Sequence, residues 1–141
     1  MTLRIGAELL DRIRRQAERA YPAECCGAIA GRPAPLKEAV RLFPLRNRRT
    51  DDPRRYLIDA DQLRRVDAAV RAAGWEIIGF YHSHPDHPPE PSAYDVEHAW
   101  PWYSYLIAAV ERGRADRLAS WVLADDRSAM RPEALEVPSE V

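Results

Sequence analysis

The chain has 141 residues, enough for one domain with its own hydrophobic core. Hydrophobic residues make up 46% and charged residues 30%, as in an ordinary globular protein, and no apolar run is long enough to span a membrane. The formal net charge is −1, so no overall positive field attracts nucleic acid. We therefore expect one domain over residues 1–141, loose after about residue 137, with no nucleic-acid or membrane partner.

The first element that we expect is an amphipathic helix at Ala7–Ala20, which Pro22 ends. No signal peptide pattern precedes it. The apolar run Cys25–Ala30 follows as a buried strand and contains both cysteines, Cys25 and Cys26. A disulfide between neighbouring cysteines strains the peptide that joins them, so we expect two buried thiols. Free thiols are typical of a reducing compartment, which favours the cytoplasm.

Strands and helices then alternate along the chain. We expect a turn at Gly31–Pro33, a strand at Leu36–Pro44, a polar loop at Arg46–Pro53, a short strand at Tyr56–Ile58 and a helix from Asp59 or Asp61 to Ala73. After the histidine segment described below, we expect paired strands at Tyr103–Val110 and Arg117–Ala124, and a further strand within Arg127–Val137. This pattern indicates an α/β (α+β) domain with a central mixed β-sheet flanked by helices.

The most informative segment is a largely apolar strand, Trp75–Tyr81, that continues into His82, Ser83, His84 and Pro85. Residues two apart on a strand point to the same side, so His82 and His84 can reach one ion. A His-x-His pair alone is weak evidence, because exposed histidines are common near strand ends. The residues that follow strengthen it.

Ser92 and Asp95 have the spacing of a helix start, with Ser92 at the cap and Asp95 one turn in. Such a turn directs Asp95 back toward the histidines. Two imidazoles and a carboxylate, with a fourth position open to water, describe a catalytic zinc site. We therefore predict His82, His84 and Asp95 as the ligands of one zinc ion, with the rigid loop Pro88–Pro91 between them.

A candidate catalytic base lies far upstream, where Glu24 precedes the first apolar strand. A carboxylate there is more often a solvated loop residue, but near zinc it can accept the proton of the bound water. The Ser92 hydroxyl is placed to donate to a developing oxyanion. Capping of the helix is the simpler role for Ser92, and one hydroxyl can serve both.

Other residues near this segment have simpler interpretations. We expect His87 at the solvent-exposed rim of the site and His98 at the surface or behind the ligands, since a fourth protein ligand would displace the water. The aromatic run Trp100–Tyr103 could line a peptide groove, but packing in the core is the preferred interpretation.

Together these residues resemble the JAMM (MPN+) metalloprotease signature, an upstream Glu followed by His-Ser/Thr-His-Pro, six residues and Ser-x-x-Asp. All seven positions are matched, by Glu24, His82, Ser83, His84, Pro85, Ser92 and Asp95. The run Pro22–Gly27 is also similar to the corresponding run in the compact bacterial members of this family. The chain thereby resembles the group of C-terminal peptidases that act on sulfur-carrier proteins. The resemblance covers roughly Leu3 to Leu123, although its specific part is confined to the two motifs.

The resemblance implies a cytidine-deaminase-like JAMM/MPN fold and one zinc ion per chain with a bound catalytic water. It assigns the ion to His82, His84 and Asp95, and the catalytic roles to Glu24 and Ser92. The implied reaction is hydrolysis of a peptide or isopeptide bond after the Gly-Gly tail of a ubiquitin-like or sulfur-carrier protein. The sequence leaves the oligomeric state open, a dimer included.

Three other classes of protein are alternatives. A zinc deaminase needs His-x-Glu with a distant Pro-Cys-x-x-Cys, and a gluzincin-type protease needs His-Glu-x-x-His; neither pattern occurs. The remaining alternative is a non-catalytic MPN-type protein-interaction scaffold. The intact ligand set together with Glu24 speaks against it.

Overall fold

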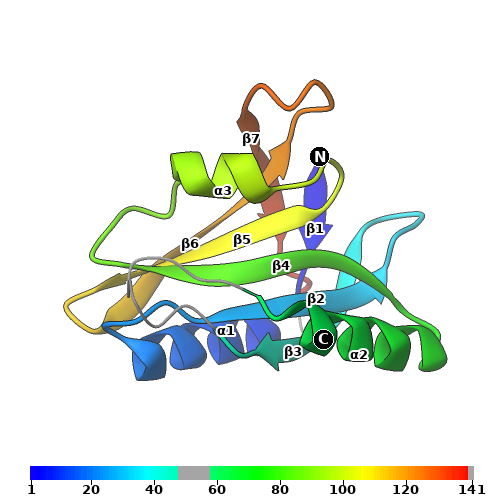
Figure 1. The fold of residues 1–141 in the computed structure, drawn as a ribbon, viewed down its shortest axis with the longest axis horizontal. Coiled ribbons are helices and arrows are strands. Elements are labelled where there is room, and N and C mark those ends of the chain that lie inside the picture. The colour runs from blue at the N-terminus through cyan, green and yellow to red at the C-terminus, as the bar shows by residue number, and fades with distance from the viewer. Residues whose placement is uncertain (48–57, 140–141) are drawn as a thin grey trace.

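A mixed β-sheet forms the centre of the computed structural model, which describes residues 1–47 and 58–139 (Figure 1). Its strands are Thr2–Arg4 (β1), Cys26–Arg32 (β2), Glu38–Leu45 (β3), Glu76–Pro85 (β4), Ser104–Glu111 (β5), Arg114–Leu123 (β6) and Met130–Glu136 (β7). Their order is β1-β3-β2-β4-β5-β6-β7, and β1 pairs with both β3 and β7. The expected central mixed sheet is therefore present, curled until its edges meet at β1.

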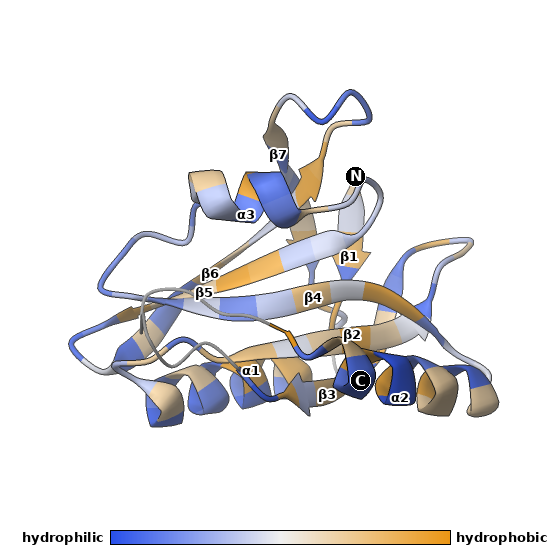
Figure 2. Ribbon diagram, in the orientation of Figure 1, coloured by the Kyte–Doolittle hydropathy of each residue, from blue (hydrophilic) through white to orange (hydrophobic). Residues whose placement is uncertain are grey.

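Helices cover the sheet on both sides (Figure 1). They span Ala7–Ala20 (α1), Ala60–Ala72 (α2) and Ala93–His98 (α3). The buried side of α1 packs into the main core, and α2 packs its apolar side chains against a second cluster on β2, β3 and β4. Hydrophilic residues lie on the outward sides of α1 and α2 (Figure 2). In the part of the chain that the structure describes, no helix is long and apolar enough to cross a membrane.

A β-bulge decides which side chains of β4 face the functional site. Ile29 on β2 is opposite Gly79, but Ala30 is opposite Ile77, so Ile78 is the extra residue on β4. Ile78 therefore joins Tyr81 in the main core, instead of sharing the face of Phe80. Beyond the bulge the normal alternation places His82 and His84 on one face of β4.

Most of the expected elements that fall on described residues are present, with small differences at their ends. The turn expected at Gly31–Pro33 begins later, because Gly31 and Arg32 still pair with Ala39 and Glu38 on β3. The strand β1 is not predicted from the sequence, because its three residues are too few to show a pattern. The polar loop expected at Arg46–Pro53 and the strand at Tyr56–Ile58 lie mostly outside the described residues. Ile58 itself forms an isolated bridge with Asn47. The end of the expected loose tail, residues 140–141, also lies outside them.

Candidate metal centre

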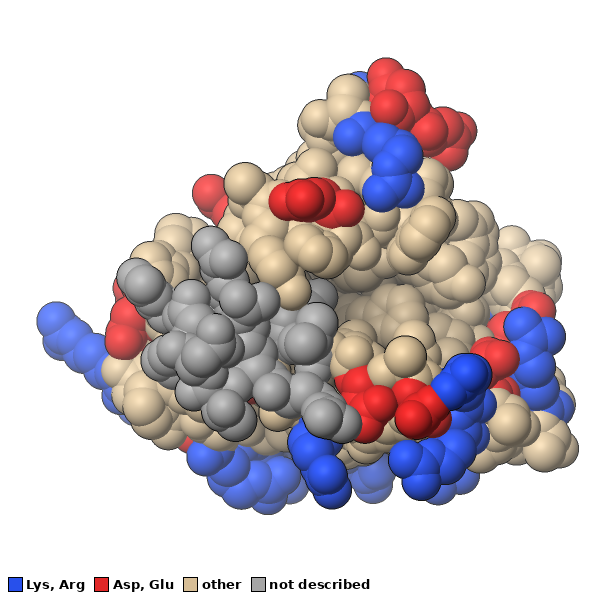
Figure 3. All heavy atoms as spheres, viewed as in Figure 1, with Lys and Arg blue, Asp and Glu red and all other residues tan. Residues whose placement is uncertain are grey.

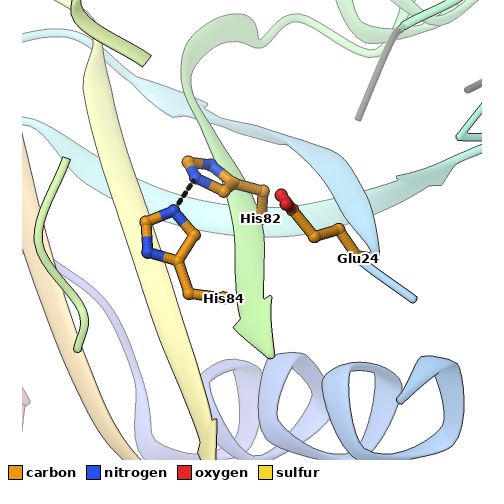
Figure 4. Close-up of side chains that lie close together, drawn as sticks. All are labelled: Glu24, His82 and His84. Carbon is orange, nitrogen blue, oxygen red and sulfur yellow. Dashed lines mark hydrogen bonds between the residues drawn. The ribbon is translucent and has the colours of Figure 1, made fainter. Parts of the chain in front are cut away.

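The two histidines come from β4, near the middle of the sheet between β2 and β5. His82 is 1% exposed and His84 8%. Their rings face each other with the Nε2 atoms 3.1 Å apart (Figure 4). Burying two imidazoles this close together is unfavourable unless their polar atoms are satisfied.

The short helix α3 supplies a carboxylate to the same point. Ser92 caps the helix: its Oγ accepts from the backbone N–H of Asp95 at 3.1 Å, and its own N–H donates to Oδ2 of Asp95 at 2.9 Å. This reciprocal pair fixes the side chain of Asp95, which is buried. The same Oδ2 lies 3.3 Å from Nε2 of His82 and 3.1 Å from Nε2 of His84.

These three atoms form a nearly equilateral triangle with the dimensions of a metal site. Zinc bonds of roughly 2.0–2.1 Å in a tetrahedron separate neighbouring ligand atoms by about 3.3 Å. The three distances found here are 3.1, 3.1 and 3.3 Å. Two imidazole nitrogens and one carboxylate oxygen are also a ligand set that zinc accepts. The residues present therefore suit a zinc ion.

The protonation of His84 strengthens this interpretation. Its Nδ1 lies 3.0 Å from the carbonyl oxygen of Pro88, which can only accept, so Nδ1 carries the proton. The neutral tautomer with its proton on Nδ1 carries a lone pair on Nε2, which lies 3.1 Å from Oδ2 of Asp95. In that tautomer Nε2 and Oδ2 can both bind a cation placed between them.

The charge of Asp95 is well suited to a cation. Burial raises the pKa of its carboxyl, but the contacts with the ring nitrogens of His82 and His84 outweigh burial and hold this pKa well below its ordinary value. Burial also lowers the pKa of His82. An anionic carboxylate beside a neutral imidazole is the protonation state in which both can bind a metal ion.

Glu24 approaches the histidines from the segment just before β2, the strand next to β4 (Figure 4). Its carboxylate and the ligand atoms of the two histidines all lie within 4.8 Å of one another, and the residue is 5% exposed. This triad differs from the ligand set derived from the sequence, which has Asp95 in place of Glu24. We favour Asp95 as ligand, because its Oδ2 lies 3.1–3.3 Å from both Nε2 atoms.

Ser83, between the two histidines, holds the backbone beside Glu24. Its Oγ accepts from the N–H of Cys25 at 2.9 Å, and its own N–H donates to the carbonyl of Cys25 at 3.1 Å. On the other side, Nδ2 of Asn47 donates to the carbonyl of Glu24 at 3.0 Å. The sequence motif includes Ser83 but does not reveal this role, and nothing in the sequence pointed to Asn47.

A cavity of about 480 Å³ opens beside these residues. Its walls include Glu24, His84, Asp95, Ser92 and the proline loop. Ser92 and His87 are exposed at its rim, as expected for His87. His98 is exposed and stacks on Tyr94 with ring centroids 4.0 Å apart, so it lies outside the cluster of His82, His84 and Asp95.

The aromatic run before β5 is not core. Trp100 is 65% exposed and Trp102 44% exposed, so the preferred interpretation of Trp100–Tyr103 as core packing is wrong for both tryptophans. The N–H of Trp100 donates to the hydroxyl of Tyr105 at 2.9 Å, which fixes the chain but leaves the indole outside. These side chains line neighbouring grooves.

Comparison with known proteins gives the family of the chain. A family model described as prokaryotic homologs of the JAB domain matches residues 6–124. The chain belongs to this family. The resemblance to JAMM metalloproteases is thereby confirmed, and with it the enzyme class, a metalloprotease-type hydrolase with a JAB/MPN fold.

Two curated relatives of this JAB-domain protein have named activities. Desampylase of Haloferax volcanii is 36% identical over 102 residues, which cover 72% of this chain and 73% of the relative. The CysO-cysteine peptidase of Mycobacterium tuberculosis is 28% identical over 129 residues, covering 91% and 87%. Both names describe hydrolases.

Solved structures support the fold of this JAB-domain protein. A solution structure of a Salinibacter ruber protein is 38% identical, with a TM-score of 0.76, and covers 96% of this chain and 91% of that chain. A structure titled as a JAMM metalloprotease-like zinc site in the proteasome and signalosome has a TM-score of 0.61 at 16% identity, covering 99% and 100%. At that identity the likeness concerns the fold alone.

Proposed function

We propose that this chain is a zinc-dependent peptidase that hydrolyses the peptide or isopeptide bond after the C-terminal Gly-Gly tail of a ubiquitin-like or sulfur-carrier protein. The observation that carries the proposal is the triangle of His82, His84 and Asp95, in which two ring nitrogens and one carboxylate oxygen converge at 3.1–3.3 Å. We assign one zinc ion per chain to these three residues. When bound, zinc supplies an activated water at neutral pH and a Lewis acid for the scissile carbonyl.

In this proposal Glu24 moves the proton. Its carboxylate accepts a proton from the attacking water and delivers it to the nitrogen of the leaving amine as the C–N bond breaks. The buried position of Glu24 beside His82 and His84 supports this role, because a base must lie within reach of the water it deprotonates. Little solvent surrounds a carboxylate at this depth, so the proton stays available for the amine.

Ser92 supplies the remaining polar contact to the substrate. Its Oγ already accepts from the N–H of Asp95, and its O–H is left to donate toward the rim of the cavity. We assign this hydroxyl to the oxyanion that develops on the scissile carbonyl. Capping of α3 and oxyanion stabilisation then use different sides of one hydroxyl group.

The route of the tail follows from cavities that share walls. Tyr94 lines both the 480 Å³ cavity at the metal centre and an apolar pocket of about 220 Å³. Leu63 and Phe80 line both that pocket and a third groove of about 540 Å³ beside α2. A hollow bordered by charged side chains is visible on this face of the molecule (Figure 3). We propose that the tail lies along this series of cavities with its glycines at the metal centre, where only a backbone without side chains approaches closely.

The relatives support this choice of substrate. One relative is named desampylase and the other CysO-cysteine peptidase, and the second name describes a peptidase that acts where cysteine is joined to CysO. We expect the reaction in the cytoplasm, since Cys25 and Cys26 are buried free thiols.

Metal content tests the site. Elemental analysis of the purified chain should give one zinc per chain, and His84→Ala should lower occupancy strongly because three ligands leave little redundancy. His87→Ala is the matched control, since this exposed histidine lies on the same cavity but outside the triangle. Full zinc occupancy in His84→Ala would show that the ligands are wrongly assigned.

Three substrates test the reaction. Mass spectrometry should show release of the group attached after Gly-Gly from a folded carrier, slower release from the same tail as a free peptide, and none when Val replaces the last Gly. The folded carrier provides binding energy remote from the bond that breaks. Equal rates on free peptide and folded carrier would exclude specificity for the carrier and would indicate a general peptidase. Zinc binding without cleavage of any tail would favour the scaffold.

A further inference from the structure

We propose that Trp121 is a positioning residue for the metal centre, acting on His84 through the loop between β4 and α3. The indole Nε1–H of Trp121 donates to the carbonyl of Pro89 at 2.9 Å. The preceding carbonyl, that of Pro88, accepts from Nδ1 of His84 at 3.0 Å. Two adjacent carbonyls of one loop thus connect Trp121 with His84. The inference rests on the proposed function insofar as His84 is a metal ligand.

The loop depends on anchors from outside because it has few donors of its own. Pro88, Pro89 and Pro91 have no N–H, so within Pro88–Pro91 only Glu90 can donate a backbone hydrogen bond. Trp121 is a firm anchor, since it lies in β6 and is paired on both sides, with Tyr105 on β5 and with Pro132 on β7. Its half-buried side chain therefore ties the middle of the proline loop to the sheet.

The position of the Pro88 carbonyl matters for the ring of His84. A hydrogen bond from Nδ1 to a carbonyl fixes both the tautomer and the orientation of an imidazole, and leaves Nε2 directed at the ion. If the loop moves away, Nδ1 loses this acceptor, and the ring is free to rotate or to change tautomer. Loss of such an outer partner commonly costs about 10–100-fold in metal affinity.

Trp121→Phe tests the inference because it removes the N–H and keeps an aromatic ring. The Pro88 carbonyl remains in the chain, so we expect the lower end of that range, zinc binding weakened about 10-fold. Competition with a chelator measures the zinc dissociation constant. Trp75→Phe is the matched control: it removes an indole N–H just before β4, where the ring contacts Arg32 and not the loop. This control should bind zinc like the parent.

A spectroscopic measurement separates positioning from general destabilisation. In ¹⁵N-labelled protein, the parent should show an exchange-protected imidazole N–H signal from His84, identified by its loss in His84→Gln. Trp121→Phe should weaken that signal, whereas Trp75→Phe should retain it. Thermal unfolding in the presence of a chelator should give similar Tm values for the three proteins, because the tryptophan bond acts on the metal centre and not on the core.

A further readout uses the parent chain and so does not depend on the folding of any variant. The indole N–H resonance of Trp121 should shift when zinc is added, because the loop connects it with His84. The inference is overturned if Trp121→Phe binds zinc with unchanged affinity, or if the Trp121 resonance does not shift when zinc is added. In either case the proposed function stands. Failure of the parent to bind zinc overturns the proposed ligands and this inference together.

Discussion

Single atoms at the metal centre serve more than one purpose. Oδ2 of Asp95 accepts the N–H of Ser92, completing the cap of α3, and also lies 3.3 Å from Nε2 of His82 and 3.1 Å from Nε2 of His84. The two ring nitrogens of His84 have different partners: Nδ1 contacts the Pro88 carbonyl in the loop, and Nε2 is directed at the metal centre. The helix cap and the metal geometry are therefore coupled through Asp95.

Glu24→Gln should separate metal binding from chemistry. The amide keeps the size of the side chain and leaves the three proposed ligands in place, so zinc content and Tm should match the parent. It cannot accept the proton of the water, so turnover should fall by at least about 10²-fold. Zinc analysis and single-turnover cleavage of the folded carrier measure the two effects.

Ser92→Ala provides the comparison for Glu24→Gln. Loss of an oxyanion donor costs about 10²–10³ in rate, and loss of the cap costs about 1 kcal/mol of stability. Ser92→Asp restores a capping oxygen without a hydroxyl donor, so it should recover stability but not rate. Parent-like cleavage by Glu24→Gln would reduce Glu24 to a buried carboxylate without a catalytic role.

The two cysteines should be unreactive in the folded chain. Burial raises the pKa of Cys25 to about 11 and that of Cys26 to about 12, so hardly any thiolate exists at pH 8. A colorimetric thiol reagent at pH 8 should label neither cysteine within minutes in buffer and both in denaturant. Rapid labelling of the native chain would contradict their burial.

At the scale of elements, the packing of β2 against β4 depends on one glycine. Gly27 pairs with Tyr81, and a Cβ on Gly27 would overlap the ring of Tyr81. That ring is 1% exposed, and its hydroxyl donates to Gln16 on α1, so it has little room to move. The residue after Tyr81 is His82, so a shifted ring would also disturb the metal centre.

The same substitution at two glycines tests this close approach. Gly27→Ser should lower the free energy of unfolding by about 1–3 kcal/mol through overpacking. Gly6→Ser should be neutral or slightly stabilising, because a Cβ there meets no atom within 4 Å and serine supplies the side-chain cap that α1 lacks. Urea unfolding measures the free energy of unfolding of both variants. Equal effects would show that the contact with Tyr81 does not limit the size of the side chain at position 27.

At the scale of the whole molecule, stability should depend on pH through the metal centre. Because burial lowers the pKa of His82, the unfolded chain takes up this proton at a higher pH than the folded chain does. In the metal-free protein, the contribution of neutral His82 to the free energy of unfolding should therefore be fully present above about pH 6.5. It should decrease as the pH falls below that value. Asp95, whose folded pKa is also depressed, adds a second loss below about pH 3.9.

Urea unfolding at pH 7.5, 6.5 and 5.5 in the presence of a chelator measures this slope. His82→Gln should flatten it, whereas His87→Asn, which changes an exposed histidine, should not. Added zinc should raise Tm most at pH 7.5, because protons compete for the ligands at lower pH. A metal-free chain whose stability did not change over this range would contradict a buried neutral His82.

Local sequence patterns determined most of the elements and several site residues. The apolar face of α1 and the capping pair of Ser92 and Asp95 depend on neighbours within a few residues, so their spacing is visible in the chain. The cap of α2 was narrowed to Asp59 or Asp61, and the structure has Asp59. The alternation of His82 and His84 is equally local. These features needed no knowledge of the fold to be predicted.

Tertiary structure alone decided what depends on distant residues. The bulge at Ile78 and the closure of the sheet through β1 follow from strand pairing, which sequence spacing does not encode. Glu24 was named as the base through the motif resemblance, but its approach to the histidines also depends on tertiary structure. The same holds for Trp121, which reaches Pro89, 32 positions earlier in the sequence. Strand order is set by the collective burial of apolar surface across the whole sheet, so no short segment carries that information.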